Sequence, residues 1–241
     1  MTEFAQVAVA VFSLLSLGQS APVTSCDNLL QQNSIQGRDQ FLGTWYYIGE
    51  STNIIGSKLL TQSVLQSSWW NVTAGNKDND LISFQNQKMF GSCFSLTYTV
   101  SVENNTLVMV NPYPSSAFLL NTGCPDCLVV YSNYTIGSSQ YKGMQLMSRR
   151  TEISAPELEE FKKQVECLKL PEPAILDSEK GFCPDPTVST EIKSLDLSSA
   201  FNSDALDQLD KILKHEKAVE ILTETISFIS KTSTSAKTVG N

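Results

Sequence analysis

The residues best suited to chemistry in this chain of 241 residues are its six cysteines and its single histidine. Cys124-Pro-Asp-Cys127 has the Cys-x-x-Cys spacing of redox-active dithiols, which need a thiolate of lowered pKa, usually at a helix N-terminus. Turn residues surround this motif, so we favour a small disulfide that pins a loop. His215 is the only base for a Ser-His or Cys-His catalyst, and one histidine excludes multi-His zinc sites. We therefore expect no catalytic residue, no metal and no cofactor.

Charge and composition narrow the class of protein further. Lysine and arginine total 17 against 25 aspartates and glutamates, which gives a net charge of −8. A nucleic-acid-binding protein normally presents a basic face, so we expect no nucleic-acid partner. Hydrophobic residues make up 41% and charged residues 17% of the chain, which predicts a folded domain with a sizeable core.

The first 20 residues have the pattern of a secretory signal peptide. Residues 5–17 form an apolar run that is too short to span a bilayer comfortably, and Gly18-Gln19-Ser20 supplies small residues before a cleavage point. The segment before the run carries Glu3 and no basic residue, which leaves a retained anchor or a buried helix as alternatives. No later stretch reaches 18 apolar residues, so we expect no stable membrane insertion.

Glycosylation sequons and paired cysteines agree with secretion. The sequons begin at Asn71, Asn104 and Asn133, and an even number of cysteines is typical of disulfides in an oxidising compartment.

The middle of the chain has the pattern of an all-β domain. Short runs of β-branched and aromatic residues alternate with turn signals, and their regular spacing predicts eight strands in an up-and-down antiparallel barrel or a sandwich. The expected strands cover residues 44–50, 62–73, 80–87, 93–102, 106–111, 117–121, 128–134 and 140–148.

Two helical patterns follow the strands. Ser154-Ala-Pro-Glu157 is a capping box that begins one flanking α-helix. Residues 204–230 carry two apolar stripes whose phase slips around His215. That segment could pack on the barrel, extend freely, contact a lipid surface or self-associate. We divide the chain into a β-barrel domain over residues 24–185 and a linker, amphipathic helix and flexible tail over residues 186–241.

Several of these motifs together resemble a known family. Gly43-Thr44-Trp45 opens the first strand about 17 residues after Cys26, Arg149 ends the last strand, and a helix ending in Cys167 comes next. This order resembles the lipocalins, and most closely the branch of alpha-1-acid glycoprotein and apolipoprotein M. Within that branch, the fish saxitoxin/tetrodotoxin-binding and tributyltin-binding proteins look nearest. The resemblance implies the eight-stranded barrel, although the usual Thr-Asp-Tyr motif is not visible.

The resemblance also implies structural roles for individual residues. Trp45 would close the barrel floor with Arg149 packed over it, Arg150 being the rival for that role. Among the cysteines, the resemblance pairs Cys26 with Cys167 and Cys93 with Cys183. Cys124 and Cys127 are left to pair with each other, in a loop that we place at the barrel mouth.

Strand alternation predicts which side chains face the lumen. If Trp45 faces inward, so do Tyr47 and Gly49. A glycosylated Asn71 must face outward, which turns its two neighbours inward, and an inward Arg149 brings the alternate residues of the last strand with it. On the seventh strand an outward Asn133 turns Val130 inward, whereas the resemblance turns Val129 and Tyr131 inward. The expected ligand-binding residues are Tyr47, Trp70, Val72, Met109 (by resemblance), Tyr131, Gln145 and Met147.

We therefore expect a monomeric, secreted carrier, in a plasma-like fluid, that sequesters a small hydrophobic or amphipathic molecule and is not an enzyme. By resemblance, a toxin or xenobiotic is the candidate guest. The same lumen residues could instead merely fill the core. Another alternative is a lipocalin-type isomerase that uses a lumen thiol. A third is a surface-acting immune-modulating or inhibitory glycoprotein, whose signal would be an exposed apolar patch within residues 204–230.

Overall fold

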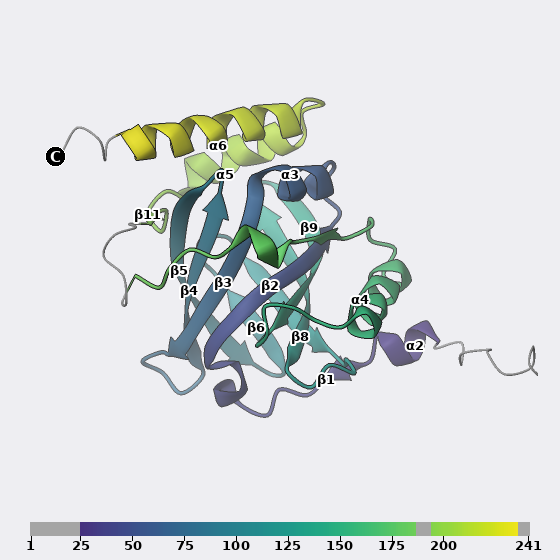
Figure 1. The fold of residues 1–241 in the computed structure, drawn as a ribbon. Helices are drawn as coiled ribbons and strands as arrows, with labels where there is room; N and C mark the ends of the chain where they lie inside the picture. Colours follow the sequence, from purple (N-terminus) through teal and green to yellow (C-terminus); the bar gives the residue numbers. More distant parts are fainter. Residues whose placement is uncertain (1–24, 187–193, 236–241) are drawn as a thin grey trace, which may run out of the picture.

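The protein is a closed β-barrel with helices on its side and over one end (Figure 1). The computed structural model describes residues 25–186 and 194–235, so the expected signal peptide lies outside them. Eight antiparallel strands form the barrel: β2 (Gly43–Thr52), β3 (Leu65–Ala74), β4 (Asp80–Met89), β5 (Ser92–Glu103), β6 (Thr106–Met109), β7 (Ser115–Leu120), β8 (Cys127–Ile136) and β9 (Ser139–Ser148).

Each barrel strand pairs with the next one along the chain, and β2 also pairs with β9. This closure removes both sheet edges and confirms the predicted up-and-down barrel. Short strands are added at the outside: β1 (Gln32–Asn33) on β7, β10 (Ala174–Ile175) on β2 and β11 (Leu195–Asp196) on β5.

The strand expected over residues 62–73 begins later than predicted, because a helix occupies its first residues. Helix α3 (Ser57–Val64) follows Gly56, which adopts a positive φ of 77°. Its Thr61 and Val64 are buried one turn apart, so the segment lies across the barrel end as a helix. Their β-branched side chains had favoured a strand locally, and packing against the barrel end decided otherwise.

One end of the barrel is closed by Trp45 and Arg149. The guanidinium carbon of Arg149 lies 3.5 Å from the centre of the Trp45 ring, which is a cation–π contact. Arg149 also donates hydrogen bonds to the backbone oxygens of Leu42 (2.7 Å) and Thr44 (2.8 Å). The Trp45 indole N–H donates to Phe41 O at 2.7 Å, at the end of the short helix η1 (Arg38–Phe41). Arg149, and not Arg150, therefore covers the floor.

Helix α4 (Ala155–Cys167) packs on the outer face of the barrel. Its capping box forms as predicted, with Ser154 N donating to Glu157 Oε2 at 2.7 Å. Phe161 and Val165 are almost fully buried against outward-facing residues of the strands, among them Val129. This second apolar layer lies between helix and barrel and is separate from the lumen.

All six cysteines form disulfides, in the two pairs that the resemblance implies and the Cys124–Cys127 pair expected from the spacing. Cys26, in helix α2 (Cys26–Leu29), is bonded to the last residue of α4, Cys167. Cys183, which follows the short helix η2 (Ser178–Lys180), is bonded to Cys93 on β5. The first bridge fastens the segment before the barrel to helix α4, and the second fastens the segment after α4 to the barrel wall.

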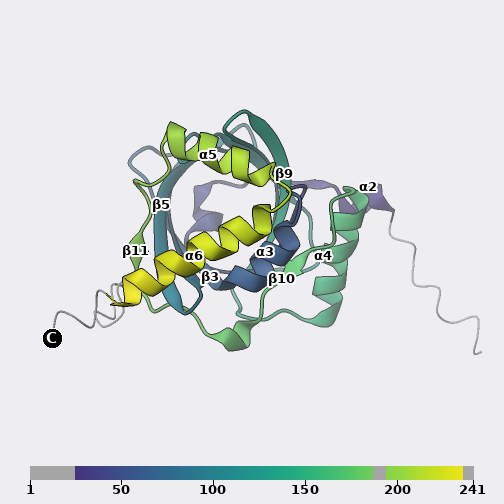
Figure 2. The ribbon, with the colours of Figure 1, turned by 90° about the horizontal axis from the view of Figure 1, so that it is seen from above.

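The C-terminal extension, residues 194–235, contains two helices where one was expected. Helix α5 (Ser203–Leu213) and helix α6 (Ala218–Ser235) are separated at His215, where the apolar stripes change phase. Seen from above, both helices and α3 lie across the end of the barrel opposite the Trp45 floor (Figure 2). No helix in the described ranges is both long and apolar enough to cross a membrane.

Candidate functional site

The barrel encloses a cavity of about 490 Å³. This volume lies within the range of small-molecule sites, which span roughly 300–1,000 Å³. All eight barrel strands contribute to its wall, Phe41 and Trp45 lie at its floor, and residues of α3 and the C-terminal extension lie at its opposite end. The lumen is therefore hollow, and its own side chains do not fill it.

Most of the predicted lumen residues lie on the cavity wall. Six of the seven expected ligand-binding residues line it: Tyr47, Trp70, Val72, Met109, Gln145 and Met147. Met109 was placed there by resemblance. Alternation from Trp45, Asn71 and Arg149 places the other five correctly because β3 and β9 keep a regular register at these positions.

Tyr131 lies outside the cavity, so its expected role in ligand binding is wrong. The residues of β8 that line the cavity are Leu128, Val130, Ser132, Tyr134 and Ile136. Tyr131 turns the other way, packs in the outer layer beneath α4 and lies with its ring 5.1 Å from that of Phe118. The alternation argument from an exposed Asn133 was the correct one, because the outer layer needs its own apolar residues.

The expected inward orientation of Gly49 is also wrong. The register of β2 against β9 shifts between Tyr47 and Gly49, which marks a β-bulge at Ile48. A side chain at Gly49 would meet the backbone oxygen of Ala174 at 2.7 Å, on the outer face. Beyond the bulge the alternation is reversed, and Glu50 lines the cavity instead.

Glu50 is the only charged residue of the cavity wall within the described part of the chain. Tyr47 donates its hydroxyl to Glu50 Oε2 at 2.6 Å, and the Thr61 hydroxyl of α3 donates to Glu50 Oε1. No ion pair involving Glu50 is formed among the described residues. Strict alternation from Trp45 places Glu50 outside. The isolated Gly49 within the strand is the signal of a bulge that could have placed this carboxylate inside.

Aromatic side chains surround the same region. The Tyr47 and Trp70 rings meet edge to face with centroids 4.9 Å apart. Trp70 donates its indole N–H to the Tyr98 hydroxyl at 2.9 Å. The Tyr134 hydroxyl lies 2.6 Å from Thr52 Oγ1. The wall thus combines large apolar faces with a few placed hydrogen-bonding groups, the usual design of a small-molecule site.

Burial keeps the phenols of the cavity protonated. Desolvation raises the pKa of Tyr47 well above its ordinary value, and the neighbouring Glu50 carboxylate raises it further. Desolvation likewise raises the pKa of Tyr98 and, to about 12, that of Tyr134. At neutral pH these hydroxyls are therefore neutral donors, and Glu50 is the only side chain of the wall that can carry a full negative charge.

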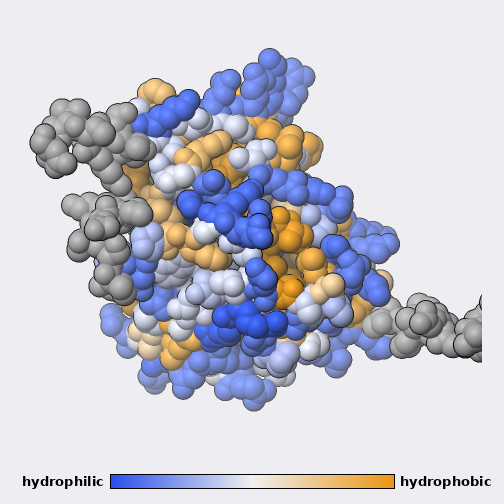
Figure 3. Space-filling model, in the orientation of Figure 1, coloured by the Kyte–Doolittle hydropathy of each residue, from blue (hydrophilic) through white to orange (hydrophobic). Residues whose placement is uncertain are grey.

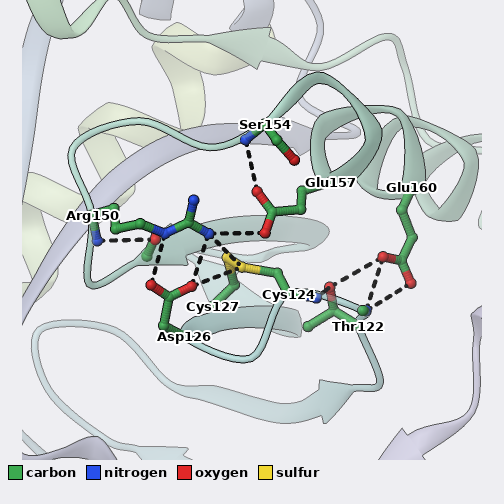
Figure 4. Close-up of a disulfide and its surroundings, with 10 residues drawn as sticks. Thr122, Cys124, Asp126, Cys127, Arg150, Ser154, Glu157 and Glu160 are labelled. Carbon is green, nitrogen blue, oxygen red and sulfur yellow. Dashed lines mark hydrogen bonds and ion pairs between the residues drawn. A yellow bond between two sulfur atoms is a disulfide. The ribbon is translucent and has the colours of Figure 1, made fainter.

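The Cys-x-x-Cys motif lies at the closed end of the barrel, so the expected position at the mouth is wrong. Cys127 is the first residue of β8 and pairs with Ser148 beside the Arg149 floor, because β8 runs from the floor upward. Arg150 binds Asp126 Oδ2 at 2.7 Å and Glu157 Oε1 at 2.9 Å, which joins this loop to α4 (Figure 4). The short disulfide thus belongs to a loop clamp and lies away from the cavity.

Two of the alternative functions depend on features that the structure locates. The thiol-dependent isomerase lacks its nucleophile, since every cysteine is bonded to another. Within residues 204–230, Leu213, Ala218, Val219 and Leu222 line the cavity, whereas Phe228 is 68% and Ile229 36% exposed. On the face shown in Figure 3, hydrophilic residues predominate and apolar ones gather in small groups.

The three sequons lie on the outside of the barrel. Asn71 follows the inward Trp70 on β3, Asn104 is exposed in the turn after β5, and Asn133 is exposed on β8. Attached glycans at these positions remain a prediction.

Comparison with known proteins gives one family and a common fold. The family model described as the ApoM domain matches residues 12–183. Lipocalin 12 from rat epididymis is similar in structure, with a TM-score of 0.55 and 15% identity, over 65% of this chain and 93% of that one. The siderocalin Ex-FABP, described as functioning "through dual ligand specificities", is also similar in structure. Its TM-score is 0.52 and its sequence identity 14%, over 58% of this chain and 95% of that one. No curated protein sequence matches the chain.

Proposed function

Because the chain belongs to the ApoM domain family of lipocalins, we propose that it is a secreted carrier that binds one small hydrophobic or amphipathic molecule inside its barrel. The observation that carries this proposal is the hollow lumen of about 490 Å³, lined mainly by aliphatic and aromatic side chains. Burial of apolar surface supplies about 25 cal/mol for each Å² removed from water. Three disulfides and the sequons support an extracellular location.

The guest carries a polar group that lies beside Glu50. A carboxylate that has no ion-pair partner among the described residues, in a wall that also contains Tyr47 and Trp70, favours a positively charged or hydrogen-bond-donating group over an anion. The rest of the guest would lie against the apolar wall toward the Trp45 floor. This arrangement supports an amphipathic toxin or xenobiotic as the guest class and disfavours simple fatty acids.

Native mass spectrometry of protein purified from its source tests this function. We expect one small-molecule adduct per chain, which unfolding of the protein releases. If no adduct is found, the purified protein is titrated with the neutral apolar probe N-phenyl-1-naphthylamine. Saturation at one probe per chain supports the carrier, and no saturable binding overturns it.

A further inference from the structure

The C-terminal extension lies outside the region that matches the ApoM domain, which ends at residue 183. Its apolar side chains nevertheless form one end of the cavity: Leu197, Phe201, Leu213, Ala218, Val219 and Leu222. The opposite end is closed by Trp45 beneath Arg149. A molecule that enters or leaves the lumen must therefore pass the end that the extension covers (Figure 2).

Three anchors hold the extension to the barrel. Strand β11 pairs in parallel with β5. Near the far end of α6, the Ser230 hydroxyl lies 2.8 Å from Ser92 Oγ. The third anchor is Asp210 on α5, which is 4% exposed although it carries a charge.

Asp210 is bound to the turn between β8 and β9. Its carboxylate accepts hydrogen bonds from the backbone N–H (3.2 Å) and the hydroxyl (3.0 Å) of Ser138 and from the Tyr141 hydroxyl (3.2 Å). Lys214, one turn later on α5, forms an ion pair with it at 2.8 Å. A buried carboxylate with this many donors is strongly held in place, and removal of its side chain leaves those donors without their acceptor.

Two glycines with positive φ let the extension approach this closely. At Gly137, in the β8–β9 turn, an added Cβ would lie 2.7 Å from Asp210 Cβ. At Gly56, before α3, it would lie 2.5 Å from Val219 Cγ2 on α6. Gly91 has nearly the same φ as Gly56 (78° against 77°), but an added Cβ there meets nothing within 4 Å. The extension is thus fitted to the barrel end at two tight contacts.

We propose that the C-terminal extension is the roof of the guest site: it contacts the bound guest, and it must release from the barrel for the guest to exchange, with Asp210 as the latch. This inference rests on the proposed carrier function. The roof contributes apolar contact area that adds to affinity, and its latch sets the rate of exchange, as lids do in other binding sites. The affinity for the guest and the rate of its exchange can be measured separately.

Stopped-flow measurement of N-phenyl-1-naphthylamine dissociation from the full chain tests the latch. Asp210→Ala should accelerate dissociation about tenfold or more, the factor that corresponds to ~1.4 kcal/mol. Asp207→Ala removes the same charge from an exposed position one turn earlier on α5 and should leave the rate within about twofold. Gly56→Ala should accelerate dissociation more than Gly91→Ala, because only the former pushes against Val219.

Equilibrium titration tests the contact with the guest. Leu222→Ala should weaken binding of the probe about fivefold or more. Phe228→Ala, on the same helix but outside the cavity wall, should not weaken it. The unaltered protein could bind the probe while Asp210→Ala and Leu222→Ala behave like their controls. In that case the proposed role of the extension as a roof is wrong, and the proposed carrier function is retained. If the unaltered protein carries no native adduct and binds no probe, the carrier function and the roof both fail.

Hydrogen exchange gives a readout that needs no guest. Asp210→Ala should raise the exchange rates of α5 amides while those of β4 and β5 stay unchanged. Unchanged α5 exchange would show that Asp210 does not hold the roof.

Discussion

Tyr47 donates a hydrogen bond of 2.6 Å to Glu50, three residues further along the same strand. Residues at this spacing point to opposite faces of a regular strand. The two meet inside the lumen because a β-bulge at Ile48 inserts one extra residue between them. A single local irregularity therefore brings the cavity's only described charge beside its aromatic residues.

The charge preference of the cavity follows from Glu50. Glu50→Gln keeps the side chain's shape and one oxygen acceptor but removes the charge. It should weaken binding of 1-naphthylmethylammonium about tenfold or more, because a cation within about 4 Å of a carboxylate gains up to ~4 kcal/mol at an effective dielectric constant of 20. Binding of the neutral 1-naphthylmethanol should change by less than about twofold. Calorimetric titration at neutral pH measures both ligands.

Glu103→Gln serves as the control, since it removes the same charge from an exposed site at the end of β5. An equal loss for the amine and the alcohol in Glu50→Gln would contradict a charge-based preference.

The floor of the barrel depends on Arg149. Arg149→Ala removes the cation–π contact with Trp45 and leaves the backbone oxygens of Leu42 and Thr44 without their donor. We expect a loss of about 2–4 kcal/mol in the free energy of unfolding, measured by urea denaturation. Arg150→Ala breaks a more exposed ion-pair clamp and should cost clearly less than Arg149→Ala. Equal costs for the two would refute the special role of Arg149.

The three disulfides should differ in their contribution to stability. The Cys26–Cys167 and Cys93–Cys183 bridges close loops with sequence separations of 141 and 90 residues, and the Cys124–Cys127 bridge one of 3. Loop-closure entropy gives upper values of ~5, ~4.5 and ~1.5 kcal/mol respectively. Paired Cys→Ala variants in urea denaturation should follow this order. A cost for the shortest bridge equal to that of the longest would mean that the Arg150 clamp depends on it.

The buried phenols predict loss of stability in alkali. Burial raises the pKa of Tyr134 to about 12, whereas an unfolded tyrosine ionises near its ordinary value of 10.0. Raised folded-state pKa values stabilise the fold fully below pH ~10, and that stabilisation is lost as the pH rises toward the folded pKa. The free energy of unfolding should therefore fall between pH ~10 and ~12. Phenolate absorbance measures the ionisation of the tyrosines, and urea denaturation at each pH measures the free energy of unfolding.

Tyr134→Phe should make this alkaline fall shallower. The expectation is refuted if the phenol of Tyr134 ionises near its ordinary pKa while the protein is still folded.

The barrel could be predicted from the sequence because its signals are local. Turn residues separate β-rich runs at regular intervals, and Trp45, Arg149 and the cysteines occur in the order of a lipocalin. Alternation then placed Trp70, Met147 and Gln145 correctly on the cavity wall.

Three features of the site were not predicted from the sequence. Alternation resets at a bulge, and the isolated Gly49 beside Ile48 is the only local sign of one, so Glu50 was missed. The apolar stripes of residues 204–230 indicated helices, but only the assembled barrel shows that Val219 and Leu222 face its cavity. Tyr131 was misplaced because the residues of β8 that pack under α4 are as apolar as those that face the lumen, so the sequence pattern does not distinguish the two faces.

The most direct test of the carrier compares two adjacent serines of β7. Ser115 lines the cavity, whereas Ser116 is exposed on the outside. Fluorescence titration with N-phenyl-1-naphthylamine should show one saturable site in the unaltered protein and in Ser116→Phe, and at least tenfold weaker binding in Ser115→Phe, with thermal unfolding confirming that all three are folded. Equal binding in all three would place the probe outside the barrel and contradict the account.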